Sequence, residues 1–308
     1  MIVYNAEPCT YSEAAISQWK ASGYKYEAGS WEDIYTQSTF LEVEVLIVRL
    51  GAVIDKAILL KFPNLKQLIS ATTGHDHIDL VVLQELNVAL ISLRNHDDFL
   101  KKITSTAEHT FALLLSLVRN IPSANADVNK GFWKRDDFRG TQLYGKSIGI
   151  IGLGRVGLMV ANYAACFGMK VFYYDPNVIN EKFSTESSLQ ALIEKVDIIS
   201  IHVHLNESTE HMISKELLTH CKFGALLINT SRGKILHEQD VINSLADGRL
   251  AGVAVDVLST ELKSIEQSIL WQSRNSYPIL ITPHIGGATY DAMWMCEEFV
   301  QSLALNSA

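Results

Sequence analysis

The sequence predicts an α/β protein whose strands form parallel sheets. Short apolar runs rich in β-branched residues alternate with helical patterns along the whole chain, and this alternation is typical of parallel strands joined by helical crossovers. A glycine-rich turn lies near the middle, between an apolar run and a helical pattern. The length of 308 residues favours about two domains. We therefore expect two doubly wound parallel-sheet domains.

The first part of the chain contains the strands of one sheet. Helical patterns, such as Ser12–Ser22 and Asp79–Leu86, separate the apolar runs. Strands are expected at Ile2–Tyr4, around Tyr24–Glu27, and at Val45–Val48, Gln67–Ser70 and Ala89–Ser92.

A long apolar helix follows. Ser105-Thr-Ala-Glu108 has the pattern of a capping box, which satisfies free N–H groups at the start of a helix. The next residues, Thr110–Val118, are apolar nearly all round, so this helix must be covered on several sides. The cover is either the same subunit or partly a second one. We favour the second, which predicts a homodimer through the helix over residues 105–118.

The second half supplies the strands of a complete doubly wound dinucleotide domain. A helix at Glu238–Asp247 is expected to end at Gly248, because glycine is typical just after a helix. Strands are expected at Ser147–Ile151, Val171–Tyr174, Asp197–His202, Ala225–Asn229, Gly252–Asp256 and Ile279–Ile281.

The glycine-rich turn has the spacing G-x-G-x-x-G, at Gly152, Gly154 and Gly157. The first glycine makes a tight turn, the second lets a pyrophosphate approach the backbone, and the third lets the helix pack closely on the strand. The helix N-terminus adds free N–H groups and a positive dipole end. The alternative is a turn that binds nothing. The strand before the turn, the helix after it and Asp175 after the next strand favour a dinucleotide site.

Asp175 indicates which dinucleotide binds. Its carboxylate can accept hydrogen bonds from ribose hydroxyls and repels a 2′-phosphate. No arginine follows it to bind such a phosphate, and Lys182 is a weak substitute. We therefore predict NAD as the cofactor, preferred over NADP.

The composition argues against several classes of partner. The net charge of −8 argues against nucleic acid and against an anionic membrane surface, since both bind basic faces. No apolar run reaches the length of about 18 residues that a membrane span needs. The N-terminus lacks the pattern of a signal peptide, so we expect a soluble, cytoplasmic protein.

The 4 cysteines lie far apart without a C-x-x-C motif, which argues against a disulfide framework and a zinc site. Cys166 and Cys221 stand in apolar helical stretches and are expected to be small core residues. No metal site is predicted, because His75, Asp76 and His77 are neighbours on an irregular loop, whose side chains rarely converge on one ion.

Three polar residues, Arg232, Glu261 and His284, each follow a predicted strand, on the side where open α/β sheets bind ligands. Hydride transfer to a carbonyl leaves an alkoxide, and a histidine can protonate it near neutral pH. A carboxylate can orient the imidazole, and an arginine can hold a planar carboxylate through two hydrogen bonds. The structural alternatives are a surface ion pair for Arg232, a solvated loop acid for Glu261 and a turn cap for His284.

Several motifs match one family: Ala71–Asp79, Gly152–Gly157, Asn229–Gly233, Ala254–Asp256 and Pro283–Gly287. Over nearly its full length the chain resembles the D-isomer-specific 2-hydroxyacid dehydrogenases, which include phosphoglycerate, D-lactate and glyoxylate/hydroxypyruvate enzymes. The resemblance implies a Rossmann NAD-binding domain at residues 98–285. It also implies that this domain is inserted into a flavodoxin-like substrate-binding domain, formed by residues 1–97 and 286–308.

The resemblance also implies roles for individual residues. Arg232, Glu261 and His284 match the catalytic residues of the family, and Arg232 also binds the substrate carboxylate. Backbone N–H groups of Thr73, Gly74 and His75 match the loop that receives this carboxylate. Asp256 matches an acid beside the nicotinamide carboxamide. The other implied cofactor contacts are Gly152, Gly154, Arg155, Val156, Gly157, Asp175, His204, Thr230 and Gly287.

The chain departs from the family pattern where His204 and Leu262 stand in place of the usual prolines. His204 lies on a loop that borders the adenosine side, and Leu262 follows the proposed catalytic Glu261. The chain ends at Ala308, before the regulatory domain of the longer phosphoglycerate enzymes, so no serine-type feedback site is expected.

The identity of the substrate is left open. Arg49 stands where some phosphoglycerate-type relatives carry a phosphate contact, but an ion pair explains it equally well. Glyoxylate, hydroxypyruvate and pyruvate are equally compatible. His75 is either a substrate contact or a hydrogen-bonded turn residue. Two further hypotheses are a non-catalytic NADH-sensing module of the same fold and a dehydrogenase of another small anion, such as formate or phosphite.

Overall fold

The computed structural model describes residues 1–307, and the chain divides into two compact units. The first unit comprises Met1–Ile103 and the segment that begins at Ala288, and the second comprises Thr104–Gly287. The first boundary follows Ile103 rather than residue 97, because Leu100 and Ile103 are buried in the core of the first unit. No helix in the described part of the chain is both long enough and apolar enough to cross a membrane.

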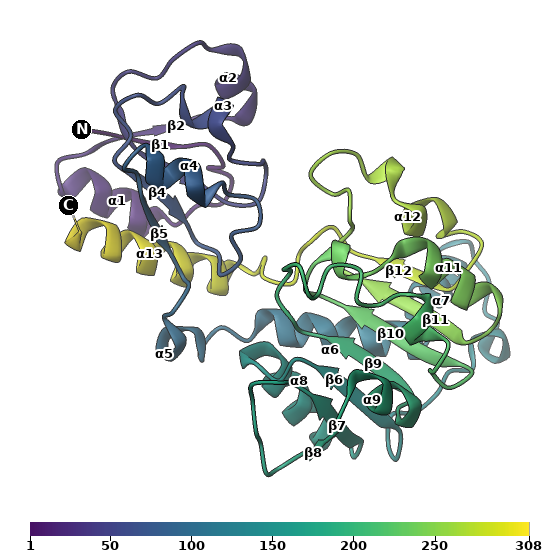
Figure 1. Ribbon diagram of the computed structural model, residues 1–308. Helices are drawn as coiled ribbons and strands as arrows, with labels where there is room; N and C mark the ends of the chain where they lie inside the picture. Colours follow the sequence, from purple (N-terminus) through teal and green to yellow (C-terminus); the bar gives the residue numbers. More distant parts are fainter. Residues whose placement is uncertain (308) are drawn as a thin grey trace. The chain divides into compact units, whose positions relative to one another are not determined.

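The first unit contains a parallel sheet with the order β2-β1-β3-β4-β5 (Figure 1). This is the flavodoxin-like order that the resemblance implied. The strands are β1 (Ile2–Asn5), β2 (Lys25–Ala28), β3 (Val43–Val48), β4 (Gln67–Ser70) and β5 (Ala89–Ser92).

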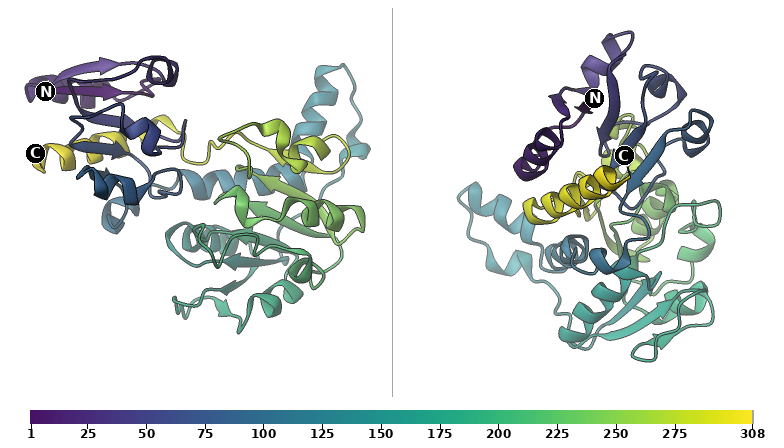
Figure 2. Two further views of the ribbon diagram at one scale, coloured as in Figure 1. Left: turned by 45° about the horizontal axis from the view of Figure 1, so that its top comes forward. Right: turned by 90° about the vertical axis from the view of Figure 1, so that its left-hand side faces the viewer.

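Side chains alternate between the two faces of this sheet. One face, which includes Val3 and Val45, packs against α1 (Glu13–Ala21), α5 (Asp97–Leu100) and α13 (Tyr290–Asn306). The opposite face packs against α2 (Trp31–Thr36), α3 (Lys56–Leu59) and α4 (Leu80–Glu85). Helix α13 lies beside α1 although the two are far apart in sequence (Figures 1 and 2), and Gln301 Nε2 donates to Ala15 O at 3.0 Å.

The second unit contains a parallel sheet with the order β12-β11-β10-β9-β6-β7-β8. Counted from β6, this is the 3-2-1-4-5-6 order of dinucleotide-binding folds, with β12 added at one edge. The short strand β8 was not predicted, because Ser184-Thr185 has no apolar residue. The strands are β6 (Ser147–Ile151), β7 (Lys170–Tyr174), β8 (Ser184–Thr185), β9 (Ile198–Ile201), β10 (Ala225–Asn229), β11 (Leu250–Val255) and β12 (Ile279–Ile281).

Helices cover both faces of the second sheet. One face packs against α6 (Ser105–Val118) and α8 (Arg155–Cys166). The helices on the other face are α9 (Leu189–Lys195), α10 (Lys215–Leu218), α11 (Glu238–Ala246) and α12 (Ile269–Ser273). Helix α7 (Ile121–Asn129) buries none of its residues. Gly248 follows α11 with φ +81°, which confirms the predicted helix stop.

Two local predictions are wrong. The capping box at Ser105 does not form, because α6 begins at Ser105 itself and that side chain is buried. The residue before the helix is Thr104, whose Oγ1 donates to Glu108 Oε1 at 2.6 Å. Cys166 is exposed, because it lies at the solvent-facing end of α8, whereas Cys221 is buried as expected.

Asp197, directly before β9, provides a test of the second unit's stability. It accepts hydrogen bonds from the backbone N–H and hydroxyl of Ser147 at 2.8 and 2.7 Å, and Lys222 Nζ lies 2.9 Å away. Partial burial acts to raise the pKa of Asp197, but these contacts outweigh it and lower the pKa to about 2. Since the usual pKa is 3.8, the carboxylate contributes stability above about pH 4 and loses it as the pH falls towards 2.

We expect Asp197→Asn to destabilise the protein at pH 7 by about 1 kcal/mol or less, because a partly exposed ion pair is screened by solvent. The difference from the unmodified protein should shrink at pH 3, because the carboxylate of the unfolded chain is then largely protonated and the ionised form no longer contributes its full stability. Urea unfolding at both pH values measures this, and an equal gap at pH 7 and pH 3 would contradict the assignment.

Candidate active site

The glycine-rich turn connects β6 to α8. Gly152 has φ +87°, and a Cβ there would lie 2.9 Å from the carbonyl oxygen of His202. A Cβ on Gly157 would lie 2.1 Å from Gly152 O, so neither position accepts a side chain. Gly154 has open space instead and precedes α8 without a side-chain cap. The uncapped N–H groups of α8, which begins with Arg155 and Val156, therefore suit a phosphate group.

Asp175 joins the turn to the end of β7. Its Oδ2 accepts from Leu153 N at 2.8 Å, and its Oδ1 accepts from Asn177 N at 2.8 Å and Val178 N at 3.1 Å. An ionised carboxylate has about four acceptor positions, so capacity remains for a ribose hydroxyl. The uncapped N–H groups at the start of α8 and the carboxylate of Asp175 therefore fit a dinucleotide.

The predicted catalytic residues follow three adjacent strands. Asn229 of β10 pairs with Val255 of β11, which pairs with Ile281 of β12, so the strands end at the same level. Arg232, Glu261 and His284 come after these ends. The register thus brings the three chain segments to one edge of the sheet.

His284 and Glu261 are in direct contact. His284 Nδ1 lies 2.8 Å from Glu261 Oε1, and the two side chains are 23% and 26% exposed. The second oxygen of Glu261 accepts from Leu258 N at 3.1 Å. With Nδ1 engaged, Nε2 is the ring nitrogen left to exchange a proton with a ligand. This is the geometry of an acid–base histidine oriented by a carboxylate.

The backbone of His284 has φ +55°, a left-handed conformation that is uncommon outside glycine and that often marks functional sites. Asp256 stabilises it. The backbone oxygen of Asp256 accepts from His284 N at 2.8 Å, and its side chain accepts from Ile285 N and Gly286 N at 2.9 and 2.7 Å. The turn that carries His284 is therefore fixed to β11.

His109 is a further member of this cluster that the sequence analysis missed. Its Nε2 lies 3.1 Å from Asp256 Oδ1 and 2.9 Å from Thr282 Oγ1. Burial acts to raise the pKa of Asp256, but hydrogen bonds from His109, Thr282 and the turn lower it overall. The available signal was one histidine in the apolar helix α6, but nothing local connects it to an acid 147 residues away.

The loop that carries Glu261 is fixed by Glu238 at the start of α11. This buried carboxylate accepts from Ser259 N and Oγ, and from Ser268 Oγ and Leu270 N, at 2.6 to 3.2 Å. Both ends of the loop are therefore attached to α11, and Leu262 replaces the usual proline without leaving the loop unsupported.

Arg232 lies next to this loop. Its Nη1 donates to Ser231 O at 2.9 Å, and its backbone oxygen accepts from Asn229 Nδ2 at 2.9 Å. A Cβ on the following residue, Gly233, would lie 2.1 Å from the carbonyl carbon of Leu258. The Arg232 segment is thus packed against the backbone that also binds Glu261.

The remaining predicted cofactor contacts lie at the same edge of the sheet. Thr230 Oγ1 is 2.8 Å from Thr110 Oγ1, and His204 O accepts from Thr209 Oγ1 at 2.6 Å. Gly287 is the last residue of the second unit.

Thr73, Gly74 and His75 follow β4 in the first unit. Thr72 Oγ1 donates to Gly74 O at 3.0 Å, and His75 O accepts from Ile78 N at 2.9 Å, which gives the loop a compact turn. Burial, followed by the charge of Arg94, lowers the pKa of His75. Among residues 1–307, no group of at least three His, Cys, Asp or Glu side chains is placed to hold a metal ion.

Comparison with known proteins identifies the family. Residues 111–286 match the model for the NAD-binding domain of D-isomer specific 2-hydroxyacid dehydrogenases, and residues 9–196 match the model for the catalytic domain of that family. A D-3-phosphoglycerate dehydrogenase of Bacillus subtilis is 34% identical over 81% of this chain and 46% of its own length. The chain thus spans about half the length of such relatives. A glyoxylate reductase of Thermococcus litoralis is 35% identical over 82% of this chain and 76% of its own length.

Solved structures agree with this family. The TT0316 protein of Thermus thermophilus superposes with a TM-score of 0.86 at 26% identity, over 100% of this chain and 97% of the other. A D-lactate dehydrogenase of Aquifex aeolicus, complexed with NAD and lactic acid, has a TM-score of 0.80 at 25% identity, over 99% and 94% of the two chains.

The position of Asp175 leads to a prediction about the cofactor. Replacing it by asparagine keeps an oxygen acceptor for the glycine loop and removes the charge that repels a 2′-phosphate. We expect Asp175→Asn to reduce the preference for NADH over NADPH about tenfold, equivalent to one interaction of about 1.4 kcal/mol. Fluorescence titration gives both dissociation constants. Equal affinities for NADH and NADPH in the unmodified protein would contradict the role of Asp175.

Proposed function

We propose a function from one premise: the chain belongs to the D-isomer specific 2-hydroxyacid dehydrogenase family and contains its NAD-binding domain. The proposed reaction is the reversible interconversion of a D-2-hydroxy acid and its 2-keto acid. The observation that carries the proposal is the contact of His284 with Glu261, at the sheet edge that also holds the glycine-rich turn.

His284 acts as the general acid and base. During reduction its Nε2 gives a proton to the carbonyl oxygen at C2, and during oxidation it takes that proton back from the hydroxyl. Glu261 holds the ring through Nδ1 and so fixes its orientation. NADH, when bound, supplies the hydride to C2, and NAD⁺ accepts it in the reverse direction.

Arg232 binds the substrate carboxylate. Its planar guanidinium can form two parallel hydrogen bonds with a carboxylate and can also polarise the neighbouring carbonyl. Backbone N–H groups of Thr73, Gly74 and His75 are proposed as further donors to that carboxylate. Asp256 and Thr230 are proposed to contact the cofactor, as are Arg155, Val156, His204 and Gly287.

Two alternatives differ from this reaction. A non-catalytic NADH-sensing module would not need the oriented His284–Glu261 pair. A dehydrogenase of another small anion is the second alternative, and an NAD-dependent formate dehydrogenase of Staphylococcus aureus is 25% identical with a TM-score of 0.83. Turnover of formate without turnover of any 2-keto acid would favour that alternative. The cytoplasmic location stays a prediction.

His284→Ala should lower kcat for 2-keto acid reduction about 10²- to 10⁴-fold, the usual contribution of a positioned general acid. The dissociation constant for NADH should stay unchanged, because the histidine acts on substrate rather than on the dinucleotide. Steady-state kinetics over a panel of 2-keto acids measures the loss. Glu261→Gln keeps a hydrogen-bond acceptor for Nδ1, so it should cause a smaller loss. Near-normal turnover by His284→Ala would remove this residue from the mechanism.

The homodimer stays a proposal, but the expectation that a second subunit covers the apolar helix over residues 105–118 is wrong. The apolar side chains Phe111, Leu113, Leu114 and Val118 of α6 are buried within the chain itself. Uncovered apolar surface occurs instead on and after α7, at Ile121, Val128, Phe132 and Trp133, the last of which is 87% exposed. We therefore place the proposed dimer contact on α7 and the residues that follow it.

The double variant Phe132→Lys/Trp133→Lys should convert a dimer into a monomer, because a buried unpaired charge is costly at an interface. Light scattering after gel filtration should then give the mass of one 34.3 kDa chain. Ile179, 94% exposed elsewhere in the second unit, provides the control Ile179→Lys, which should leave the mass unchanged. A monomeric unmodified protein would contradict the proposal.

A further inference from the structure

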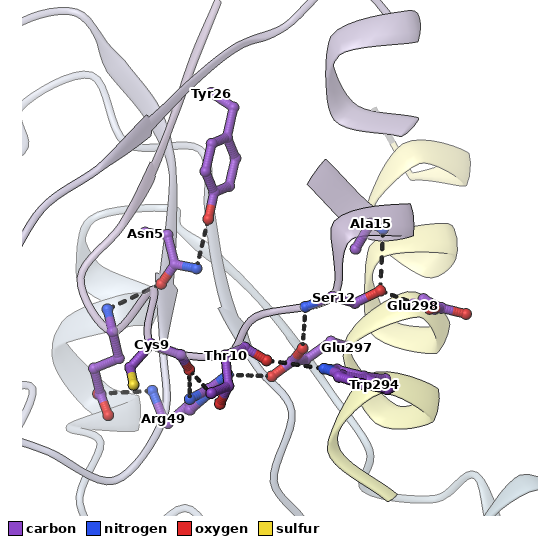
Figure 3. A network of polar contacts seen from close by, with 11 residues as sticks. Asn5, Cys9, Thr10, Ser12, Ala15, Tyr26, Arg49, Trp294, Glu297 and Glu298 are labelled. Carbon is purple, nitrogen blue, oxygen red and sulfur yellow. Dashed lines mark hydrogen bonds and ion pairs between the residues drawn. The ribbon is translucent and has the colours of Figure 1, made fainter. Parts of the chain in front are cut away.

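Arg49, directly after β3, is the residue for which the sequence left a phosphate contact and an ion pair equally open. Figure 3 shows its side chain beside Glu297 and Cys9. The guanidinium forms an ion pair with Glu297 of α13, and Nη1 donates to Cys9 O at 2.9 Å. It also lies 5.8 Å from the centre of the Tyr11 ring. Only 18% of the side chain is exposed.

Glu297 depends on this ion pair. Its side chain is 1% exposed, and its Oε2 accepts from Ser12 N at 2.8 Å. Burial raises the pKa of Glu297, and the charge of Arg49 is the main opposing influence. If Arg49 turned towards a ligand, it would leave a buried carboxylate without its cation, which is strongly unfavourable. The ion pair therefore resists opening.

The same network fixes the chain around Arg49. Trp294 Nε1 donates to Thr10 O at 2.9 Å, and Ser12 Oγ donates to Glu298 Oε1 at 2.6 Å, so α13 is attached to the loop after β1 (Figure 3). These contacts oppose any shift of α13 that would separate Glu297 from Arg49.

A second acid increases the negative charge at the end of β3. Glu7 Oε1 accepts from Arg49 N at 2.9 Å and from Gly51 N at 3.2 Å. Two carboxylates thus contact Arg49: that of Glu297 pairs with the guanidinium, and that of Glu7 accepts from the backbone N–H. The local charge is negative, and a phosphate dianion would be repelled rather than bound.

We propose that the substrate of this protein carries no phosphate, and that the Arg49–Glu297 ion pair is the cause of the selectivity. The substrate class is then a short 2-keto acid, or the matching D-2-hydroxy acid, whose carboxylate is its only anionic group. This inference rests on the proposed function. It separates the chain from the D-3-phosphoglycerate dehydrogenases that it resembles in sequence.

The test compares hydroxypyruvate with 3-phosphohydroxypyruvate, which differ by the phosphate alone. With NADH and the unmodified protein, kcat/KM should favour hydroxypyruvate at least about tenfold, the effect of one charged interaction of about 1.4 kcal/mol. A preference for the phosphorylated acid would overturn the inference and leave the proposed function intact. In that case the exposed Arg94, which follows β5, would be the next cation to replace in a search for the phosphate contact. Absence of turnover with every 2-keto acid would instead overturn the proposed function and, with it, this inference.

Glu297→Gln tests whether the ion pair is the cause. It removes the charge that holds Arg49 and keeps a hydrogen-bond acceptor, so kcat/KM for the phosphorylated acid should rise about tenfold, as expected for one charge-assisted hydrogen bond. The value of kcat/KM for hydroxypyruvate should change little. Glu298→Gln makes the same change at the exposed neighbouring residue and should leave the ratio of the two substrates unchanged. If Glu297→Gln leaves the ratio of kcat/KM for the two substrates unchanged, the ion pair is not the cause of the selectivity. The comparison of the two substrates with the unmodified protein remains valid even if that variant does not fold.

Discussion

The buried carboxylate of Asp256 is the group on which the geometry of the candidate active site depends. It accepts hydrogen bonds from two successive N–H groups of the turn after β12, while its own backbone oxygen accepts from His284 N. A carboxylate offers about four acceptor positions, so one buried acid can hold a whole turn. The left-handed backbone of His284 is sustained by these contacts, because such a conformation costs energy by itself.

A second buried acid has the same function for the partner of His284. Glu238 attaches both ends of the Glu261 loop to α11. The two catalytic candidates are therefore held by acids that do not take part in the proposed chemistry. Such support fixes a reacting pair in position, which is what general acid–base catalysis requires.

Two contacts between a carboxylate and a basic side chain, Glu261–His284 and Glu297–Arg49, serve different purposes, and their burial explains why. Glu261 and His284 are each about a quarter exposed, so a ligand can reach the pair and a proton can move. Glu297 is almost completely buried beneath Arg49, so opening that pair would leave a buried carboxylate without its cation. The exposed pair is thus suited to catalysis, whereas the buried pair is suited to holding the fold and, by the inference above, to excluding a phosphorylated substrate.

Sequence alone determined the features that depend on local patterns. The strands Gln67–Ser70, Ser147–Ile151 and Ala225–Asn229 were predicted with their observed bounds, because short, largely apolar runs between helical patterns favour buried parallel strands. The glycines of the turn at 152–157 were interpreted from spacing. Only the tertiary structure decided which polar groups meet: His109 with Asp256, and Arg49 with Glu297, 147 and 248 residues apart. Packing of helices on the sheets brings such partners together, and no local pattern encodes it.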